Sequence, residues 1–240
     1  MNDLSGSDRS DAAPGPAAVG RVRRVAAFDF DGTVSRRDTL MPFVARFAGV
    51  PRSALGTVRT GWSSVSGGNP NRADRDAVKA EMLRRLVAGR DERDLDRAAG
   101  RYAAALIDRA LRPEMVDEIR RHVAARHQTL FVSASLVNYL RPIARYLHMT
   151  DVIAVELDQR DGVLTGAMVH PNVRAEQKAL RLREWLGLPA QGPTEGVELW
   201  AYGNSSGDHE LLAMADHAYW LGKERACPPG AVQFDVRGFG

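Results

Sequence analysis

Five short, nearly continuous apolar runs divide the chain and predict buried strands. They lie at residues 25–30, 129–135, 152–157, 197–202 and 217–222. Such runs are typical of parallel strands that are covered on both faces. Helical patterns lie between most of the runs, at residues 113–123, 136–147 and 180–186. Strands that alternate with helices predict an α/β fold built on a parallel sheet.

Residues 36–112 interrupt this alternation, because nothing in the interval has the pattern of a buried strand. Apolar residues recur there at helical spacing, at Val78, Met82 and Leu86 and then from Leu95 to Leu106. The prediction is a helical insert at 36–112, with residues 21–35 and 113–240 forming the α/β core. The segment 162–170 has the pattern of a small β-excursion from that core.

The composition bears on three properties of the protein, namely secretion, disulfide bonding and nucleic-acid binding. Residues 1–20 are polar, contain Pro and Gly and lack the apolar stretch of a signal peptide, so we expect a disordered leader. The one cysteine, Cys227, excludes an intrachain disulfide and fits a cytoplasmic protein. Basic and acidic residues are interspersed along the predicted helices, which gives no reason to expect a nucleic-acid partner.

Polar side chains follow three of the predicted strands. The first strand ends in "DFDGT", the second in "SAS" and the fourth in "GNSSGD". The carboxyl ends of parallel strands meet at one edge of a sheet, where ligands bind. Taken alone, each stretch also fits a turn or a helix start, because Asp, Ser, Asn and Gly favour both.

The residues within these stretches suggest anion and cation binding. Asp29 and Asp31 are two apart, so that a strand would point both carboxylates to one face, where they repel unless a cation or a proton intervenes. Ser133 stands where a hydroxyl and the following helix start could hold phosphate. Lys178 is one of three lysines in a chain with 33 basic residues, so a compact ammonium is a candidate requirement there.

"DFDGT", "FVSAS", Lys178 and "YGNSSGDHELL", in that order, resemble the four motifs of the haloacid dehalogenase superfamily of phosphohydrolases. The resemblance covers residues 25–223. "FDGTVSRRDTL" and "FVSAS" are similar to subfamily IB, the phosphoserine-phosphatase-like group. The resemblance implies a Rossmann-like core and makes the helical insert a cap of the first, C1, type.

The resemblance also implies roles for single residues. Asp29 would be the nucleophile that forms an aspartyl-phosphate, and Asp31 would be the general acid and then the base. Ser133 and Lys178 would hold the phosphoryl oxygens. Asp29, the backbone carbonyl of Asp31 and the fourth motif would hold Mg²⁺.

One residue departs from the family pattern. The fourth motif usually begins Gly-Asp, whereas this chain has Asn204 after Gly203. An amide oxygen can still bind Mg²⁺, but the site loses one negative charge. We therefore expect Asn204 and Asp208 to share the ligand role, with weaker metal binding than in relatives that have Asp.

The substrate is not defined by these motifs. Asp38 and Lys79 are candidates for lining the entrance, although a solvated helix face explains each of them equally well. The first hypothesis is a phosphatase of a small phosphorylated metabolite, such as phosphoserine. The second is a phosphatase of lipid phosphates at a membrane surface, which would use the arginines near 84–93. The third is a phosphate-binding protein that has lost turnover through Asn204.

Overall fold

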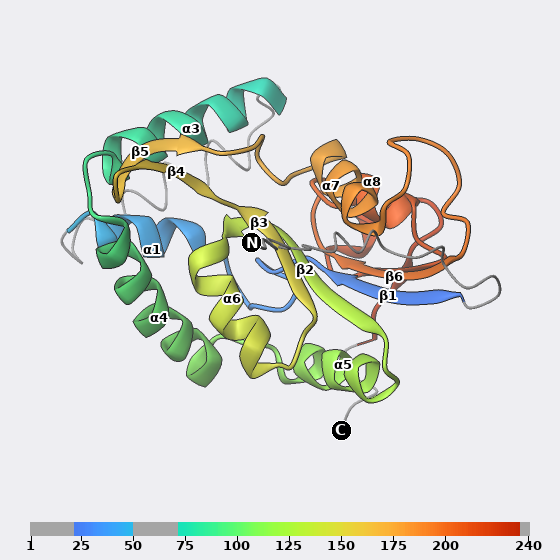
Figure 1. The fold of residues 1–240 in the computed structure, drawn as a ribbon. Coiled ribbons are helices and arrows are strands. Elements are labelled where there is room, and N and C mark those ends of the chain that lie inside the picture. The colour runs from blue at the N-terminus through green and yellow to red at the C-terminus, as the bar shows by residue number, and fades with distance from the viewer. Residues whose placement is uncertain (1–21, 50–71, 236–240) are drawn as a thin grey trace, which may run out of the picture.

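The computed structural model describes residues 22–49 and 72–235. The predicted leader at 1–20 and part of the predicted insert lie outside these residues. A six-stranded parallel sheet forms the centre, in the order β3-β2-β1-β6-β7-β8 (Figure 1). Its strands are β1 (Arg23–Phe28), β2 (Gln128–Leu136), β3 (Asp151–Val155), β6 (Val197–Gly203), β7 (His217–Trp220) and β8 (Val232–Gln233). The predicted parallel α/β fold is confirmed.

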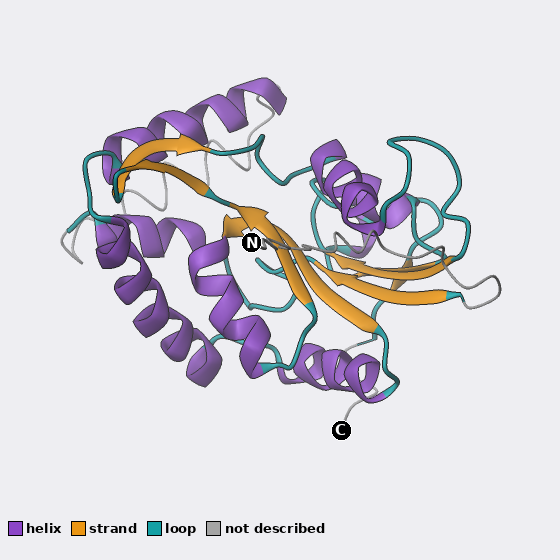
Figure 2. Cartoon of the chain, viewed as in Figure 1, coloured by secondary structure: helices purple, strands orange, loops and turns teal. Residues whose placement is uncertain are grey.

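Helices cover both faces of this sheet (Figure 2). α5 (Pro113–Ala124) and α6 (Val137–Tyr146) lie on one face, and α7 (Glu176–Leu186) and α8 (His209–Ala213) lie on the other (Figure 1). Chain order explains the division. β1, β2 and β3 are added in one direction, and β6, β7 and β8 in the other, so right-handed crossovers place their helices on opposite faces. The strand order therefore reverses beside β1, where ligands are expected at the carboxyl ends.

Between β1 and α5, the described residues form α1 (Leu40–Phe47), α3 (Arg72–Val87) and α4 (Glu92–Arg109). These helices gather at one end of the molecule, with a small hairpin alongside α3 (Figure 1). The hairpin is the predicted β-excursion and consists of β4 (Leu157–Arg160) and β5 (Val163–Met168). The division into a cap at 36–112 and a core at 21–35 and 113–240 stays a prediction.

Close packing fixes the hairpin against α3. Gly166 has a φ of +81°, and a Cβ there would lie 2.6 Å from the Cα of Arg84. Only glycine permits this approach, because any side chain would overlap the helix backbone. Backbone hydrogen bonds of 2.8 Å then join Leu164 to Gly89 and Arg90, between α3 and α4. A segment that follows β3 in sequence is thereby tied to helices that precede β2.

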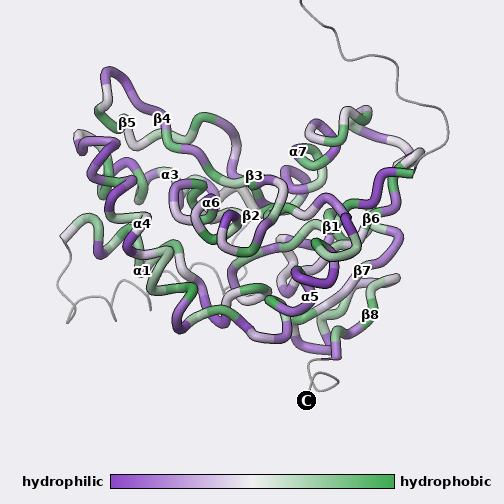
Figure 3. Tube along the Cα trace, turned by 60° about the horizontal axis from the view of Figure 1, so that its bottom comes forward, coloured by the Kyte–Doolittle hydropathy of each residue, from purple (hydrophilic) through white to green (hydrophobic). Residues whose placement is uncertain are grey.

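The buried face of α3 differs from the prediction by one residue. Val78, expected inside, is 39% exposed, whereas Lys79 is 2% exposed and shares the buried face with Leu83 and Val87. α4 follows the predicted pattern more closely, with Leu95, Ala99 and Leu106 buried, and its hydrophobic and hydrophilic residues alternate along the chain (Figure 3). As a consequence, the side chain of Lys79 points toward the interior of the protein.

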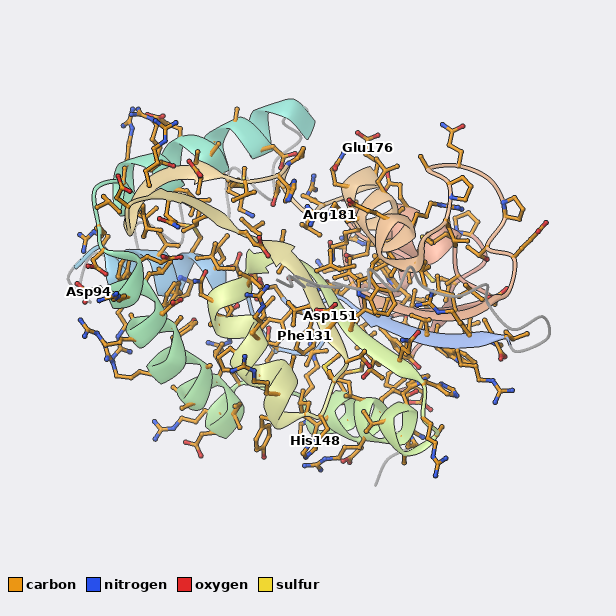
Figure 4. All side chains as sticks on the ribbon, in the orientation of Figure 1. Asp94, Phe131, His148, Asp151, Glu176 and Arg181 are labelled. Carbon is orange, nitrogen blue, oxygen red and sulfur yellow. The ribbon has the colours of Figure 1, made fainter. Side chains whose placement is uncertain are left out.

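The other elements follow the sequence with small shifts. The predicted strand at 152–157 ends at Val155, and Leu157 already begins the hairpin. Phe131 is fully buried at the centre of β2, as its apolar run predicts (Figure 4). The 3₁₀ helix η1 (Glu224–Ala226) and the two-residue β8 had no apolar run to announce them. Within residues 22–49 and 72–235, none of the helices combines the length and the hydropathy of a membrane span.

Candidate active site

A buried ammonium joins the ends of β1 and β6. The Nζ atom of Lys178, near the start of α7, donates to Oδ1 of Asp29 at 2.5 Å and to Oδ1 of Asp208 at 2.6 Å. All three side chains are buried. Two carboxylates therefore share one ammonium, and this group alone carries one excess negative charge when both are ionised.

Burial and the two-to-one pairing of carboxylates with the ammonium shift the pKa values of Asp29, Lys178 and Asp208. Burial and the neighbouring Asp208 raise the pKa of Asp29 to about 7, against the lowering effect of Lys178. Burial lowers the pKa of Lys178, but the two carboxylates outweigh it and hold that pKa above its usual value. Burial also opposes the ionised form of Asp208, yet Lys178 and two backbone N–H groups hold its pKa below the usual value. Asp208 is thus the more firmly ionised partner.

Asp208 organises the loop after β6. Its Oδ2 atom accepts from the backbone N–H of Asn204 at 3.1 Å and from the backbone N–H and hydroxyl of Ser205, each at 2.9 Å. Gly203 must be glycine, because a Cβ there would lie 2.5 Å from the Cβ of Asp208. Both carboxylate oxygens of Asp208 therefore have protein partners.

The start of α7 is tied to the same loop. The backbone N–H of Ala175 donates to the carbonyl of Gly207 at 2.8 Å. Ala175 has a φ of +54°, which is unfavourable for a residue with a side chain and is sustained only by the surrounding contacts. This turn places Lys178, three residues later, against both carboxylates.

Asn204 lies directly against the turn that follows β1. The hydroxyl of Thr33 is 3.0 Å from Oδ2 of Asp29 and 3.3 Å from Oδ1 of Asn204, so that these two oxygens flank one point. Gly32 has a φ of +83°, and a Cβ there would lie 2.2 Å from Nδ2 of Asn204. The glycine of "DFDGT" is thus required both by the turn and by the approach of Asn204.

Asp31 occupies a separate polar environment at the start of α1. Its Oδ1 atom accepts from the backbone N–H of Thr39 at 2.8 Å and from the Thr39 hydroxyl at 2.6 Å. Its Oδ2 atom accepts from the hydroxyl of Ser135. Burial and nearby Asp38 raise the pKa of Asp31 to about 6, although these hydrogen bonds favour the ionised form. Asp31 can therefore carry a proton near neutral pH.

One cavity of about 300 Å³ brings the predicted residues together. Of the residues singled out from the sequence, Asn204 alone is not among those that line it. The others line this cavity and are Asp29, Asp31, Asp38, Lys79, Ser133, Lys178 and Asp208. The hydroxyl oxygen of Ser133 accepts from the backbone N–H of Ser135 at 3.2 Å.

Among the site residues that the sequence did not predict are Ser135, Thr39 and Asn172. Ser135 holds Asp31 and could have been found, since it lies two residues from Ser133 on the same strand face. Thr39 binds the other oxygen of Asp31, and Asn172 lines the cavity. Nothing in the local sequence marks either of them, because their roles depend on where α1 and the segment before α7 come to lie.

The oxygen atoms at this site fit a hard cation to which each residue contributes one ligand atom. Among the described residues, no three His, Cys, Asp or Glu side chains form a group that could hold a metal ion. A carboxylate oxygen of Asp29 and the amide oxygen of Asn204 nevertheless flank the Thr33 hydroxyl, beside the excess negative charge. Carboxylate, amide and carbonyl oxygens with several waters are what Mg²⁺ prefers.

The ion pairs of Lys178 predict a large effect on stability. Lys178→Met should lower the free energy of unfolding by about 3 kcal/mol, because it leaves two buried carboxylates without their cation. The loss should shrink as the pH falls, since protonation removes the unpaired charges. Urea unfolding at pH 8 and pH 5 measures both effects. Lys223→Met, at an exposed lysine, is the matched control, and an equal loss in both variants would contradict the assignment.

Comparison with known proteins identifies the family. The family model for haloacid dehalogenase-like hydrolases matches residues 26–213. The chain is 31% identical over 208 residues to Protein CicA of Caulobacter vibrioides (strain NA1000 / CB15N), covering 86% of this chain and 90% of that protein. A protein of unknown function from Bordetella pertussis Tohama I has a similar structure, with a TM-score of 0.69 and 26% identity, covering 83% of this chain and 90% of that one.

A more distant structure shares the fold alone. It is a phosphoserine phosphatase solved as an analogue of its phospho-aspartyl intermediate, with a TM-score of 0.59 and 18% identity, covering 83% of this chain and 87% of that one. The matched family range includes β1, β2, α7 and β6, which carry the residues described above. The chain therefore belongs to the family of haloacid dehalogenase-like hydrolases.

Proposed function

We propose that this protein hydrolyses phosphate monoesters of small metabolites through a covalent phosphate on Asp29. One observation carries the proposal: the Asp29 carboxylate stands at the carboxyl end of β1, hydrogen-bonded to a buried ammonium, on a cavity that Asp31 also lines. A nucleophile, a phosphate-binding cation and a carboxyl group that can hold a proton are the groups that this reaction needs.

The first half of the reaction assigns different tasks to the two aspartates. A carboxylate oxygen of Asp29 attacks phosphorus, and the bond from phosphorus to the ester oxygen breaks. Asp31 gives its proton to the departing alkoxide, which leaves as an alcohol. Lys178 and the hydroxyl of Ser133 offset the negative charge on the phosphoryl oxygens. Hydrogen bonds from Thr39 and Ser135 keep the Asp31 carboxyl oriented for this transfer.

The second half regenerates the enzyme. Water attacks the phosphorus of the phosphorylated Asp29, and the ionised Asp31 takes a proton from that water. The bond between phosphorus and the Asp29 oxygen breaks, which releases inorganic phosphate and restores the carboxylate. One carboxyl group serves as acid and then as base, because each half leaves it in the state that the next half needs.

Mg²⁺ is the cofactor that this donor set suits best. Asp29, the amide oxygen of Asn204 and the backbone carbonyl of Asp31 would hold it, with waters filling the other positions. A bound Mg²⁺ would supply positive charge that reduces repulsion between the anionic substrate and Asp29. Because both oxygens of Asp208 have protein partners, we propose that Asp208 positions Lys178 and the loop in place of the ligand role expected from the sequence.

Asn204 gives a direct test of the metal site. Asn204→Asp should tighten Mg²⁺ binding about tenfold, because it adds a negative charge beside the ion. Asn204→Leu, which has a similar volume and no oxygen, should weaken it. Calorimetric titration of each variant with Mg²⁺ measures both affinities without relying on turnover. Unchanged affinity in both variants would remove Asn204 from the ligand set.

The proposed activity is tested by phosphate release from a broad panel of phosphomonoesters, with and without Mg²⁺. Hydrolysis that depends on Mg²⁺ supports the proposal. A failure to hydrolyse any ester, together with retained binding of inorganic phosphate, would favour the alternative of a phosphate-binding protein without turnover.

The membrane-surface alternative depends on arginines that have partners within the protein. Among the arginines near 84–93, Arg84 and Arg85 both pair with Glu81. Arg90 donates to two carbonyl oxygens at the end of α1. Each of these guanidinium groups has a partner, although the Arg84 and Arg85 side chains stay 63% and 72% exposed and such surface pairs are weak. Co-sedimentation with anionic vesicles at low and high salt separates the two alternatives, since salt-sensitive binding would favour lipid phosphates. A cytoplasmic location stays a prediction of the sequence.

A further inference from the structure

A second buried lysine lines the candidate active site, and the proposed hydrolysis does not use it. Lys79 belongs to α3 and is 2% exposed. Its Nζ atom donates to the carbonyl of Ala134 at 2.5 Å and to Oδ1 of Asn172 at 2.5 Å. Ala134 lies between the cavity-lining Ser133 and the Ser135 that holds Asp31. The ammonium is therefore part of the same cavity wall.

Neutral oxygens are the hydrogen-bond partners of this ammonium. No carboxylate in the described part of the chain forms an ion pair with it, in contrast to the two that hold Lys178. An ammonium has three N–H donors, and the two neutral acceptors use two of them. A buried charge with neutral partners alone is costly, so an anion that reaches the third donor would be stabilised.

Asn172 fixes the direction of the ammonium. Its amide nitrogen donates to Oδ1 of Asp76 at 2.6 Å, which turns its amide oxygen toward Lys79. Asp76 and Lys79 are three residues apart on α3, so that Asn172 bridges one turn of the helix. The lysine is thus held in place before any ligand arrives, and its entropic cost on binding is small.

The charged groups around Lys79 determine how many negative charges a ligand can carry at this site. Burial lowers the pKa of Lys79 to about 7, while Asp76, Asp31 and Asp38 raise it and Arg174 lowers it. A bound anion would favour the charged ammonium. Because Asp38 and Asp76 also line the cavity, a ligand with many negative charges would be repelled. Arg174 also lines the cavity and partly offsets these carboxylates, so that the charges suit one additional anionic group.

We propose that Lys79 binds a second anionic group of the substrate, a carboxylate or a second phosphate. The proposal rests on the proposed phosphatase function, in which the transferred phosphoryl group lies at Asp29 and Lys178. The substrate class is then a small phosphomonoester with a second anionic group, and esters of neutral alcohols are poorer substrates. A cavity of about 300 Å³ suits a metabolite of this size.

Three esters with one glycerol skeleton test the proposal. Glycerol 3-phosphate has no second anion, 3-phosphoglycerate adds a carboxylate, and glycerol 1,3-bisphosphate adds a phosphate. We expect a higher kcat/KM for one or both of the esters that carry a second anionic group, and the better substrate identifies which group Lys79 binds. Lys79→Met should lower that preference, the ratio of the two kcat/KM values, about 10- to 100-fold, which is the value of one hydrogen bond to a charged partner.

Two further variants separate binding from folding. Lys79→Gln keeps a donor for Ala134 or Asn172 but has no charge, so it should lose the same preference even where Lys79→Met fails to fold. Lys223→Met should keep the preference. An equal loss on all three esters, or no preference in the unmodified protein, would overturn the proposal.

A binding measurement distinguishes this failure from failure of the proposed function. Calorimetry with the Asp29→Asn protein compares the affinity of 3-phosphoglycerate and of the bisphosphate with that of glycerol 3-phosphate, with and without Lys79→Gln. Selective binding that depends on Lys79, together with no phosphatase activity in the unmodified protein, would retain the anion site and reject hydrolysis. Hydrolysis of all three esters with equal affinity would retain the phosphatase and reject the anion site.

Discussion

Asp29→Asn should lower phosphatase activity by about 10⁴-fold or more, because an amide cannot take the place of the carboxylate that attacks phosphorus. The substitution keeps the size of the side chain and leaves an amide oxygen that can accept from Lys178. It therefore removes the reacting atom with little change to the cavity. Phosphate release from 4-nitrophenyl phosphate in the presence of Mg²⁺ measures the loss.

Loss of folding would not explain that result. Burial and Asp208 raise the pKa of Asp29 from 3.8 to about 7. A carboxyl group whose pKa is raised on folding destabilises the folded state by an amount that grows as the pH rises from 3.8 to about 7 and is then constant, and the penalty disappears below its unfolded pKa. A neutral amide avoids this penalty, so Asp29→Asn should be at least as resistant to urea at pH 8 as the unmodified protein.

The control and the intermediate complete this test. Asp94→Asn makes the same change at an exposed carboxylate on the outer side of α4 and should leave the activity unaltered (Figure 4). Acid quenching during turnover of a labelled substrate should trap phosphate on the unmodified protein and not on the variant. Activity of Asp29→Asn within tenfold of the unmodified protein would reject Asp29 as the nucleophile.

The site residues that could be predicted from the sequence are mainly those at the carboxyl ends of strands. The apolar runs located β1, β2 and β6, and their polar ends became neighbours because those strands are adjacent in the sheet. Lys178 could be proposed because it is a rare residue type in this chain, although its two carboxylate partners come from other elements. Local pattern and topology together were thus sufficient for the centre of the site.

Other parts depend on contacts that no local pattern encodes. The periodicity of apolar residues predicts that Val78 lies on the buried face of α3 and that Lys79 is in solvent. In the structure Lys79 is buried and lines the candidate active-site cavity, whereas Val78 is exposed. Periodicity assumes that the buried side of a helix meets an apolar core, and that assumption fails beside an active site. Asn172 is similar, since its contacts with Lys79 and Asp76 join segments nearly a hundred residues apart.

Asp31→Asn should separate the two halves of the proposed reaction. With an alkyl phosphate, the variant should lose about 10³-fold in kcat, because the alkoxide leaves without a proton and the hydrolytic water has no base. With 4-nitrophenyl phosphate, the leaving group is weakly basic and departs without help. The first half should therefore stay fast while the second half is slow, giving a burst of nitrophenol equal to the enzyme concentration.

The pH dependence gives the same assignment an independent readout. Burial and Asp38 raise the pKa of Asp31 to about 6, and only the protonated carboxyl can serve the leaving group. The attacking Asp29 must be ionised, and its pKa is about 7. In single turnovers with an alkyl phosphate, the rate of the unmodified protein should therefore rise to a plateau between about pH 6 and 7 and fall above it, whereas the low rate of Asp31→Asn should keep the rise and lack the fall. An aryl ester should show little decline in either protein. A variant without a burst, or one that keeps the decline, would place the general acid elsewhere and leave Asp31 as a residue that holds the start of α1 through Thr39.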